Sequence, residues 1–448
     1  MENNHVLSLD FDREYPRIVS GKGIYMYTED GTEIVDGASG PVLVSLGHGI
    51  TEIADAVGEQ TKKIAFVHRD DCVTPVLEES CKTFTEASNG DLYATFQVCG
   101  GSEANEIAIK LARNYHRFRG DHKKYKILAR WQSYHGSSMG VMSISGFSSR
   151  REGYEPYLFE HGHIAPCYCY RCWFGEKPES CGLQCAHALE SEILTQGPDT
   201  VAAFIAEPVS GMSLCAAEAH PDYFKKIREI CDKYNVLLIL DEVMTGWGRT
   251  GKMFAYQHYG IVPDMVSTGK AVSGGYYPLA AVSVTKKFYD GYHETGAKFK
   301  PGYSWSGNPT GAAAQLAAYK YLNDHDLVEN CRKMGDYLKS RIAEIAKRHP
   351  MMGDIRGRGL MVGIELVKDK ETREPFDPAL GMASQVQDEC LDGQNMIIEA
   401  SSGCNKGTSG DALVISPAFV VTSDEIDMIV DKLDKAITKV EAKNGLAS

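Results

Sequence analysis

The sequence predicts an α/β fold built on a mainly parallel sheet that helices cover on both faces. Two observations lead to this prediction. Strand-like and helical segments alternate through much of the chain, which is the order of a parallel sheet with crossover helices. The run Val236–Leu240 is apolar throughout, as expected for a strand buried on both faces. At 448 residues, the chain is also long enough for two domains.

The expected elements follow one another in a definite order. The first is a hairpin within GIYMYTEDGTEIVDGAS that turns at Asp30-Gly31, a dipeptide typical of tight turns. After it we expect helical periodicity over 51–88, strands at 92–98 and 125–130 with a helix at 102–118 between them, a strand at 201–208, a helix at 221–234, the strand at 236–240, a helix at 311–324 and a strand at 355–367.

This order predicts three parts of the chain. Residues 1–60 form an N-terminal segment that joins the smaller domain. Residues 61–325 form a large domain, and residues 326–448 form a small C-terminal domain of helices around a few strands.

The composition narrows the class of protein. The formal net charge of −13 argues against a general binder of nucleic acid or of anionic membranes, because a phosphate polyanion would be repelled. The opening MENNHVLSLDFDREYP has no basic segment followed by an apolar core, and no apolar run approaches membrane-spanning length. We therefore expect a cytoplasmic protein.

There are 13 cysteines, an odd number that favours reduced thiols over a disulfide framework. Five of them are close together in the sequence, and two interpretations are open for this group. The spacing is compatible with a zinc or iron–sulfur site, but cysteine is also often a small buried hydrophobe. We favour the second interpretation and expect no metal. The five are Cys167, Cys169, Cys172, Cys181 and Cys185.

An acid and an amine in the middle of the chain point to a specific chemistry. Asp241 follows the apolar strand, and Lys270 follows Thr268-Gly269 and precedes a small, flexible segment. Pyridoxal phosphate (PLP) needs a lysine that holds its aldehyde as a Schiff base, and an acid that keeps its ring nitrogen protonated. Taken singly, Asp241 could be an exposed loop acid and Lys270 a solvated surface lysine.

Three further segments each follow a predicted strand. The glycines of Cys99-Gly100-Gly101-Ser102 would let the backbone approach a ligand at a helix start, where free N–H groups attract an anion, although Ser102 could also be a simple N-cap. Tyr134-His135-Gly136 offers an aromatic ring for stacking, and Glu207-Pro208 leaves a carboxylate at the sheet edge. Each of these segments also has an ordinary structural explanation.

In this order, the segments resemble one family over nearly the whole chain. LLILDEVMTGWGRTG followed by Lys270, together with GGSEANEIAIKLAR and SYHG, is similar to the class III aminotransferases, which are fold-type I enzymes that use PLP. The resemblance implies a large domain with a seven-stranded, mainly parallel sheet and a smaller α+β domain. It also implies a homodimer with shared active sites.

The resemblance implies a role for each site residue. Lys270 binds the cofactor and shuttles the proton between substrate and cofactor, and Asp241 pairs with the ring nitrogen. The remaining cofactor contacts that it implies are Gly101 and Ser102 at the phosphate, Tyr134 and Val243 at the ring faces, His135 and Glu207 at neighbouring strand ends, and the partner subunit's Ser304 at the phosphate.

Several positions depart from the family pattern. Met244 stands where a glutamine is usual, and Met212 and Val414 stand where a glutamate and an arginine usually form a gate that grips the α-carboxylate. A charge left alone and buried there would be costly, so the joint loss of both charges is physically consistent. Ser137 replaces the arginine of 4-aminobutyrate enzymes, and Val42 replaces a large aromatic, which suggests a wider entrance.

These departures predict a β- or ω-amine donor, for example a β-amino acid or a β-aminoacyl thioester. Enzymes acting on 3-aminobutyryl-CoA, taurine or β-alanine are candidate relatives, and the expected acceptor is a 2-oxo acid such as pyruvate or 2-oxoglutarate. The cation for its carboxylate could be Arg69, Arg150 or Arg356. A PLP-dependent lyase or decarboxylase on the same fold is the alternative. A non-catalytic scaffold would lack Lys270 or Asp241, and a nicotinamide dehydrogenase would show G-x-G-x-x-G after its first strand.

Overall fold

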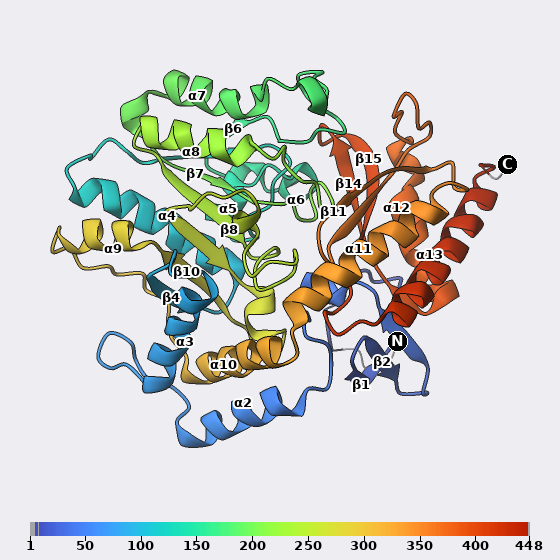
Figure 1. Cartoon of the computed structure of the whole chain (residues 1–448), viewed down its shortest axis with the longest axis horizontal. Helices are drawn as coiled ribbons and strands as arrows, with labels where there is room; N and C mark the ends of the chain where they lie inside the picture. Colours follow the sequence, from blue (N-terminus) through green and yellow to red (C-terminus); the bar gives the residue numbers. More distant parts are fainter. Residues whose placement is uncertain (1–4, 8, 447–448) are drawn as a thin grey trace.

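A seven-stranded sheet forms the centre of the protein (Figure 1). The computed structural model describes residues 5–7 and 9–446. Strand β10 runs antiparallel to its two neighbours, and the other six strands point the same way, so the sheet is mainly parallel as predicted. In spatial order the strands are β4 (Ala94–Val98), β10 (Ala280–Val284), β9 (Met265–Thr268), β8 (Leu237–Glu242), β7 (Val201–Ala206), β5 (Lys126–Arg130) and β6 (Gly162–Ile164).

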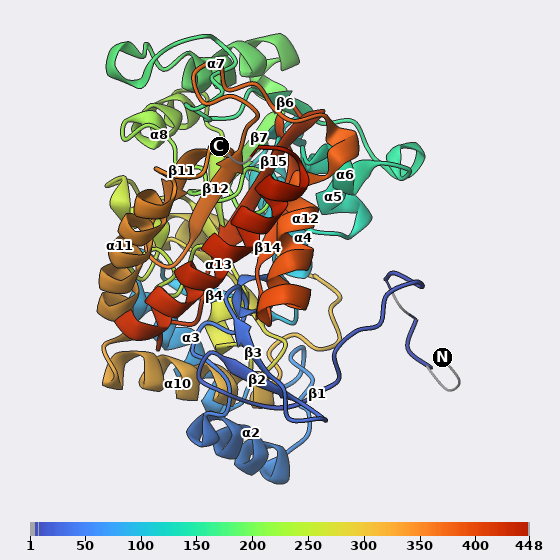
Figure 2. The ribbon, with the colours of Figure 1, turned by 90° about the vertical axis from the view of Figure 1, so that its right-hand side faces the viewer.

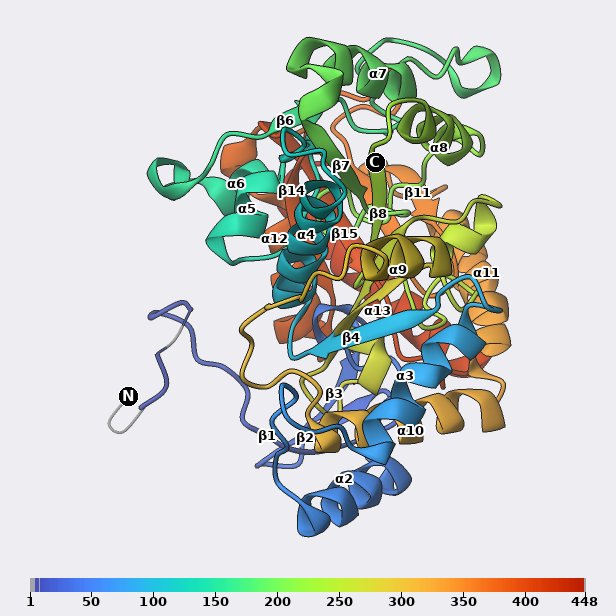
Figure 3. The same ribbon diagram turned by 90° about the vertical axis from the view of Figure 1, so that its left-hand side faces the viewer.

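The side chains of β8 show why this apolar run lies at the centre of the sheet. Leu237 and Ile239 pack into the core on one face, and Leu238 and Leu240 pack into the core on the other. Alternation along an extended strand sends successive side chains to opposite faces, so a strand covered on both sides must be apolar throughout. Figure 3 shows helix α4 on one side of the sheet, and the covering helices are α4 (Gly101–Phe118), α7 (Gln184–Gln196), α8 (Tyr223–Lys233) and α9 (Lys286–His293).

The C-terminal part of the chain forms a second, antiparallel sheet covered by helices (Figure 2). Its strand order is β11-β12-β15-β14, and α13 lies across it. The elements are α11 (Leu327–Ile345), β11 (Met352–Gly357), β12 (Val362–Leu366), α12 (Met382–Asp388), β14 (Glu399–Asn405), β15 (Ser409–Ile415) and α13 (Ser423–Lys443).

The N-terminal segment packs against this C-terminal part. Its predicted hairpin is confirmed, with β2 and β3 antiparallel and Gly31 at a φ of +86° in the turn. Ile24 and Val35 belong to the same apolar cluster as Leu413 and Ile415. The elements are β1 (Ile18–Lys22), β2 (Tyr25–Thr28) and β3 (Glu33–Asp36), with β13 (Met396–Ile397) pairing in parallel to β3. The division at residues 60 and 325 remains a prediction.

The expected single strand over 355–367 is wrong, because the segment forms two antiparallel strands, β11 and β12. Gly357 has a φ of +105° and Gly359 a φ of +57°, so the backbone turns there and the strand ends. The helical periodicity over 51–88 is likewise interrupted. It forms α2 (Thr51–Lys63) and α3 (Pro75–Ala87), and Pro75 starts the second helix because proline suits a first helical position.

Helix α10 (Pro309–Asp324) lies below the sheet beside α2 and α3 (Figure 1). It begins at Pro309, two residues before the predicted start, because the Asn308 side chain accepts hydrogen bonds from the backbone N–H groups of Thr310 and Gly311. Among the residues that the structure covers, no helix is both long and apolar enough to span a bilayer.

Candidate active site

A cavity of about 370 Å³ opens at the carboxyl ends of the parallel strands, where ligands of such sheets collect. Every predicted cofactor residue except Ser304 lies on its walls. Ser304 is exposed on the loop before α10 and is not among the residues that line this cavity. The lining comprises Pro41, Gly101, Ser102, Asn105, Tyr134, His135, Gly136, Phe147, Arg150, Glu207, Val209, Gly211, Met212, Asp241, Val243, Met244, Lys270 and Glu399.

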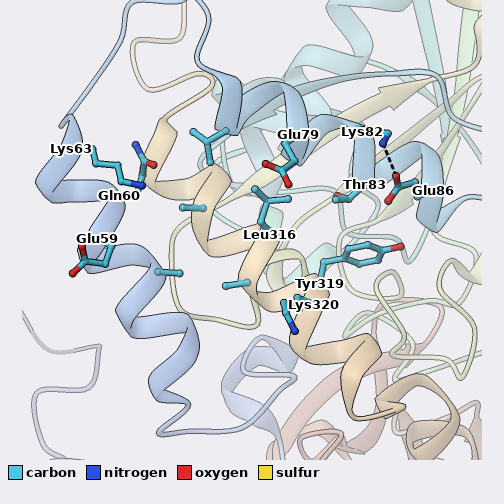
Figure 4. A pocket seen from close by; sticks show the side chains of 14 residues that line it. Glu59, Gln60, Lys63, Glu79, Lys82, Thr83, Glu86, Leu316, Tyr319 and Lys320 are labelled. Carbon is cyan, nitrogen blue, oxygen red and sulfur yellow. Dashed lines mark ion pairs between the residues drawn. The ribbon is translucent and has the colours of Figure 1, made fainter.

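A larger groove, of about 570 Å³, has a different character (Figure 4). All of its lining comes from helices α2, α3 and α10, so no strand end reaches it. Leu316 and its alanine neighbours on α10 form an apolar floor, and oppositely charged side chains such as Lys82 and Glu86, 3.3 Å apart, stand at the rim. This groove is a helix packing surface, and its Lys82–Glu86 ion pair is exposed to solvent.

The alternation of β8 decides which of two adjacent acids faces the cavity. Asp241 lines it, whereas Glu242 points to the opposite face of the sheet. There the Glu242 carboxylate accepts hydrogen bonds from the Thr245 hydroxyl and from the N–H groups of Ala255 and Tyr256. Burial raises the pKa of Glu242 to about 7. Glu242 therefore anchors the segment after β8, and Asp241 is the acid available to a ligand.

Asp241 is held by three hydrogen bonds. Its Oδ2 accepts from Asn105 Nδ2 at 2.8 Å and lies 2.8 Å from His135 Nδ1, and its Oδ1 accepts from the Val243 N–H at 3.1 Å. Only 4% of Asp241 is exposed. A buried carboxylate with this many donors is fixed in direction, which suits it to pair with a positive group.

Lys270 follows β9 and has an unusual backbone. Its φ is +48°, a left-handed conformation that costs energy for a residue with a side chain. Its Nζ donates a hydrogen bond to the carbonyl oxygen of Pro41 at 2.5 Å. Burial lowers the pKa of Lys270 to about 8, although the negative charges of Glu399 and Asp241 oppose this shift. The amine is therefore neutral in a useful fraction of molecules near neutral pH.

Two glycines allow close packing of the backbone at the start of α4. A Cβ on Gly101 would lie 2.8 Å from Val243 Cγ1, and a Cβ on Gly136 would lie 2.5 Å from Ser102 Oγ. The N-cap residue is Gly100, so Ser102 is not the N-cap. Its Oγ instead accepts a hydrogen bond from the Ser137 N–H. The first-turn N–H groups of this 18-residue helix face a region suited to an anion.

Glu207 lies at the end of β7 beside a buried arginine. Arg130 Nη2 donates to the Glu207 backbone oxygen at 2.7 Å and lies 3.9 Å from Glu207 Oε2. Burial raises the pKa of Glu207, with Arg130 acting in the opposite direction.

The other terminal nitrogen of the Arg130 guanidinium, Nη1, donates a hydrogen bond to Cys167 Sγ. One of the five clustered cysteines thus has a structural partner, and within the described ranges no group of three or more His, Cys, Asp or Glu residues is arranged to hold a metal ion.

Part of the cavity wall is apolar. Met212 lines it and packs against the apolar cluster that contains Val414, so the two positions of the expected gate lie close together without charge. Met244 also lines the cavity. Val42 does not: it is 1% exposed, and Pro41 takes the place on the wall. The expectation that Val42 widens the entrance is therefore not supported by its position.

The structure separates the three candidate arginines. Arg150 lines the cavity. The Arg69 guanidinium lies 4.0 Å from the Phe96 ring centroid beside a different cavity, and Arg356 is buried with Glu365 and the Leu214 carbonyl. Arg150 is thus the candidate that can reach a ligand in this site.

Sequence reasoning missed two residues of the site. Asn105 stands three positions after Ser102 on α4, which puts both on one helix face, so the quoted GGSEAN segment contained this signal. Glu399 begins β14 and reaches the cavity from the C-terminal sheet. It carried no signal, because nothing in its local sequence places it beside the strand ends of the other sheet.

The donor set fits PLP. Asp241 offers a fixed carboxylate for a protonated ring nitrogen, Lys270 offers a partly neutral amine for an aldehyde, and the start of α4 offers N–H groups for a phosphate. His135 Nε2, Asn105 Oδ1 and Glu207 Oε2 are buried and have no hydrogen-bond partner among the described residues, which leaves polar atoms free for a ligand. Fold and site together define a PLP-dependent transferase of fold type I.

Comparison with known proteins identifies the family. The Aminotransferase class-III model matches residues 12–437, so the chain belongs to the class III aminotransferases and is a PLP-dependent enzyme. Taurine–pyruvate aminotransferase from Bilophila wadsworthia is 36% identical over 96% of this chain and 93% of its own, and putrescine–pyruvate aminotransferase from Pseudomonas aeruginosa is 32% identical over 95% and 91%. A crystal structure of an amine transaminase from an uncultivated Pseudomonas species, in its PLP-bound form, has a TM-score of 0.90 at 29% identity over 98% and 99%.

Proposed function

We propose that this aminotransferase moves an amino group from a β- or ω-amine donor to a 2-oxo acid such as pyruvate or 2-oxoglutarate. The donor class comprises β-amino acids, their derivatives such as β-aminoacyl-CoA thioesters, and terminal amines. Met212 on the cavity wall, which packs against the cluster containing Val414, carries the proposal, because neither position supplies a charge for a gate that grips the α-carboxylate of an α-amino donor. Taurine and putrescine, for which two relatives are named, are not α-amino acids either.

In this proposal, the residues of the cavity have separate roles. When bound, PLP supplies an electron-accepting ring that allows a bond at the amine-bearing carbon to be broken. The Asp241 carboxylate would balance the positive charge of the ring nitrogen, and Asn105 and His135 hold that carboxylate in place. Lys270 Nζ would attach the cofactor, and as a base of lowered pKa it would carry a proton.

Other side chains of the cavity hold and orient the ligands. Gly101, Ser102 and the start of α4 would hold the phosphate of the cofactor, and Tyr134 and Val243 would pack against its ring. Arg150 binds the carboxylate of the 2-oxo acid, since a guanidinium matches a carboxylate with two parallel hydrogen bonds.

We propose that the enzyme works as a homodimer in which Ser304 serves the partner's phosphate site. The loop that carries Ser304 presents exposed apolar side chains, with Trp305 59% exposed and 5.9 Å from the Phe66 ring, which is 38% exposed. Exposed aromatic groups of this kind mark association surfaces.

We also propose a cytoplasmic location, because all 13 cysteines are present as free thiols, as expected in a reducing compartment.

A two-stage titration of the purified holoenzyme tests the donor and the acceptor. Each amine is first added without a 2-oxo acid, and the visible absorption of the cofactor is followed. Pyruvate or 2-oxoglutarate is then added to restore the original spectrum. We expect conversion with β- and ω-amines and recovery only with a 2-oxo acid. Conversion of the cofactor with α-amino acids but not with β- or ω-amines would overturn the proposed donor class. Turnover of an amine without any 2-oxo acid would identify a lyase instead.

A further inference from the structure

Two oppositely charged side chains line the cavity without a direct contact to another charged or polar group of the described residues. Arg150, in α6 (Ser148–Arg151), and Glu399, at the start of β14, both line the cavity. Within the described part of the chain, neither side chain makes a hydrogen bond or an ion pair of 4.0 Å or less. An unpaired charge in a concave site is most simply explained by a ligand that carries the opposite charge.

Strand pairing explains how Glu399 reaches this position. In the antiparallel pair of β14 and β15, Glu399 lies directly opposite Val414. Val414 is fully buried in the same apolar cluster against which Met212 packs. The carboxylate therefore stands beside an apolar wall and is partly withdrawn from solvent, which strengthens its interaction with any cation that enters.

The pKa of Glu399 agrees with its partial burial. Burial raises its pKa, while the positive charges of Lys270 and Arg150 act in the opposite direction. The carboxylate is thus within electrostatic range of the amine that reacts and of the guanidinium at the cavity wall. A small donor attached near Lys270 would be able to place its far end beside Glu399.

We propose that Glu399 selects amine donors whose non-reacting end is positively charged, such as α,ω-diamines. This inference rests on the proposed aminotransferase function and narrows its donor class. A second ammonium pairs with the carboxylate by a charge-assisted hydrogen bond. A neutral alkyl end leaves the carboxylate unpaired, and a carboxylate or sulfonate end is repelled by it. Glu399 would then recognise the cationic donor in one half-reaction, and Arg150 would recognise the anionic acceptor in the other.

The test compares matched donors with pyruvate as the fixed acceptor. The donors are 1,4-diaminobutane, butylamine and β-alanine, and kcat/KM is measured for each with the wild type and with Glu399→Gln. The amide keeps the shape of the side chain and removes its charge. Glu371→Gln is the control, because Glu371 is an exposed acid of the C-terminal part that lies outside the cavity.

We expect the wild type to prefer the diamine over butylamine, and butylamine over β-alanine. In Glu399→Gln the preference for the diamine over butylamine should fall about tenfold, the effect of losing one charged hydrogen bond, with butylamine little changed. A wild type that favours β-alanine over the diamine, or an equal loss for all donors in Glu399→Gln, would overturn the role of Glu399. A protein that reacts with no β- or ω-amine at all would instead refute the proposed function itself.

Discussion

His135 Nδ1 and Asn105 Nδ2 both lie 2.8 Å from the same oxygen, Oδ2 of Asp241. Asn105 Nδ2 is also 2.8 Å from the carbonyl oxygen of His135, so the three residues form a closed set of contacts beneath the cavity. The set joins the first turns of α4, the segment after β5 and the end of β8. A carboxylate fixed from three elements keeps its direction when a ligand binds, because any rotation breaks more than one hydrogen bond.

Removing the amide of Asn105 should loosen this acid. In Asn105→Ala, Asp241 loses one donor, and we expect the free energy of unfolding of the apo protein to fall by about 1–3 kcal/mol. We also expect a tenfold or greater loss of kcat, on the order of one lost charged hydrogen bond. Urea unfolding and steady-state kinetics measure the two effects. Asn323→Ala is the control, since Asn323 is exposed near the end of α10, and equal effects in both variants would exclude the positioning role.

Lys270→Ala should remove covalent attachment of the cofactor. Treatment of the holoenzyme with borohydride, followed by mass spectrometry of its peptides, should find the cofactor mass on the peptide containing Lys270 in the wild type only. Turnover should fall by about 10³-fold or more, because the proton carrier is lost with the attachment point. Lys123→Ala, at an exposed surface lysine, should behave as wild type. Cofactor trapped at another lysine of the wild type would contradict the assignment.

The lowered pKa of Lys270 predicts how cofactor capture depends on pH. Its protonated amine is unable to attack an aldehyde, so the rate of covalent capture by the apo protein should rise with pH and level off above about 8, the pKa that burial gives this amine. A solvated lysine would continue to gain reactivity up to its usual pKa of 10.5. Stopped-flow absorption over this range measures the midpoint.

The lowered pKa of Lys270 also makes the stability of the folded protein depend on pH. Between pH 8 and 10.5 the unfolded chain keeps a proton on Lys270 that the folded protein has released, so the stability of the apo protein should rise with pH across this window. Lys270→Met removes the titration, and its stability should lack this contribution. Identical pH profiles for the two proteins would show that Lys270 is solvated in the folded state.

Gly136 should tolerate no side chain. Its φ is +137°, and a Cβ there would meet Ser102 Oγ at 2.5 Å and Val141 Cγ2 at 2.6 Å. We expect Gly136→Ala to cost about 1–3 kcal/mol of stability and to weaken cofactor retention during dialysis, because Ser102 must move. In the control Gly58→Ala, a Cβ within α2 meets open space, and stability should be unchanged or higher by about 0.5–1 kcal/mol.

Shared active sites can be tested by mixing inactive subunits. Ser304→Asp places a negative charge where the proposed dimer brings the phosphate of the partner's site, so we expect this variant to be inactive, as Lys270→Ala is. Unfolding and refolding the two together should restore activity to about one quarter of wild type, because half of the dimers are mixed and each mixed dimer has one intact site. If Ser304 serves its own subunit, mixing should restore nothing.

Much of the site was readable from the sequence because of one topological rule. Residues that follow parallel strands meet at one edge of the sheet, so Asp241, Lys270, Glu207 and Tyr134 could be grouped from their order along the chain. The sequence analysis named Asp241 as the acid without a physical argument against its neighbour Glu242. The alternation of β8 supplies that argument, because adjacent residues of a strand point to opposite faces.

The sequence by itself thus determined the sheet and the cofactor class, and it predicted the acid–amine pair, since these depend on local patterns and on chain order. Only the tertiary structure decided which arginine reaches the cavity, that Val42 is buried instead of lining the entrance, and that Glu399 lines the cavity. Those outcomes depend on how two separately formed sheets pack against each other. Local periodicity carries no information about such contacts, because they join side chains that lie far apart along the chain.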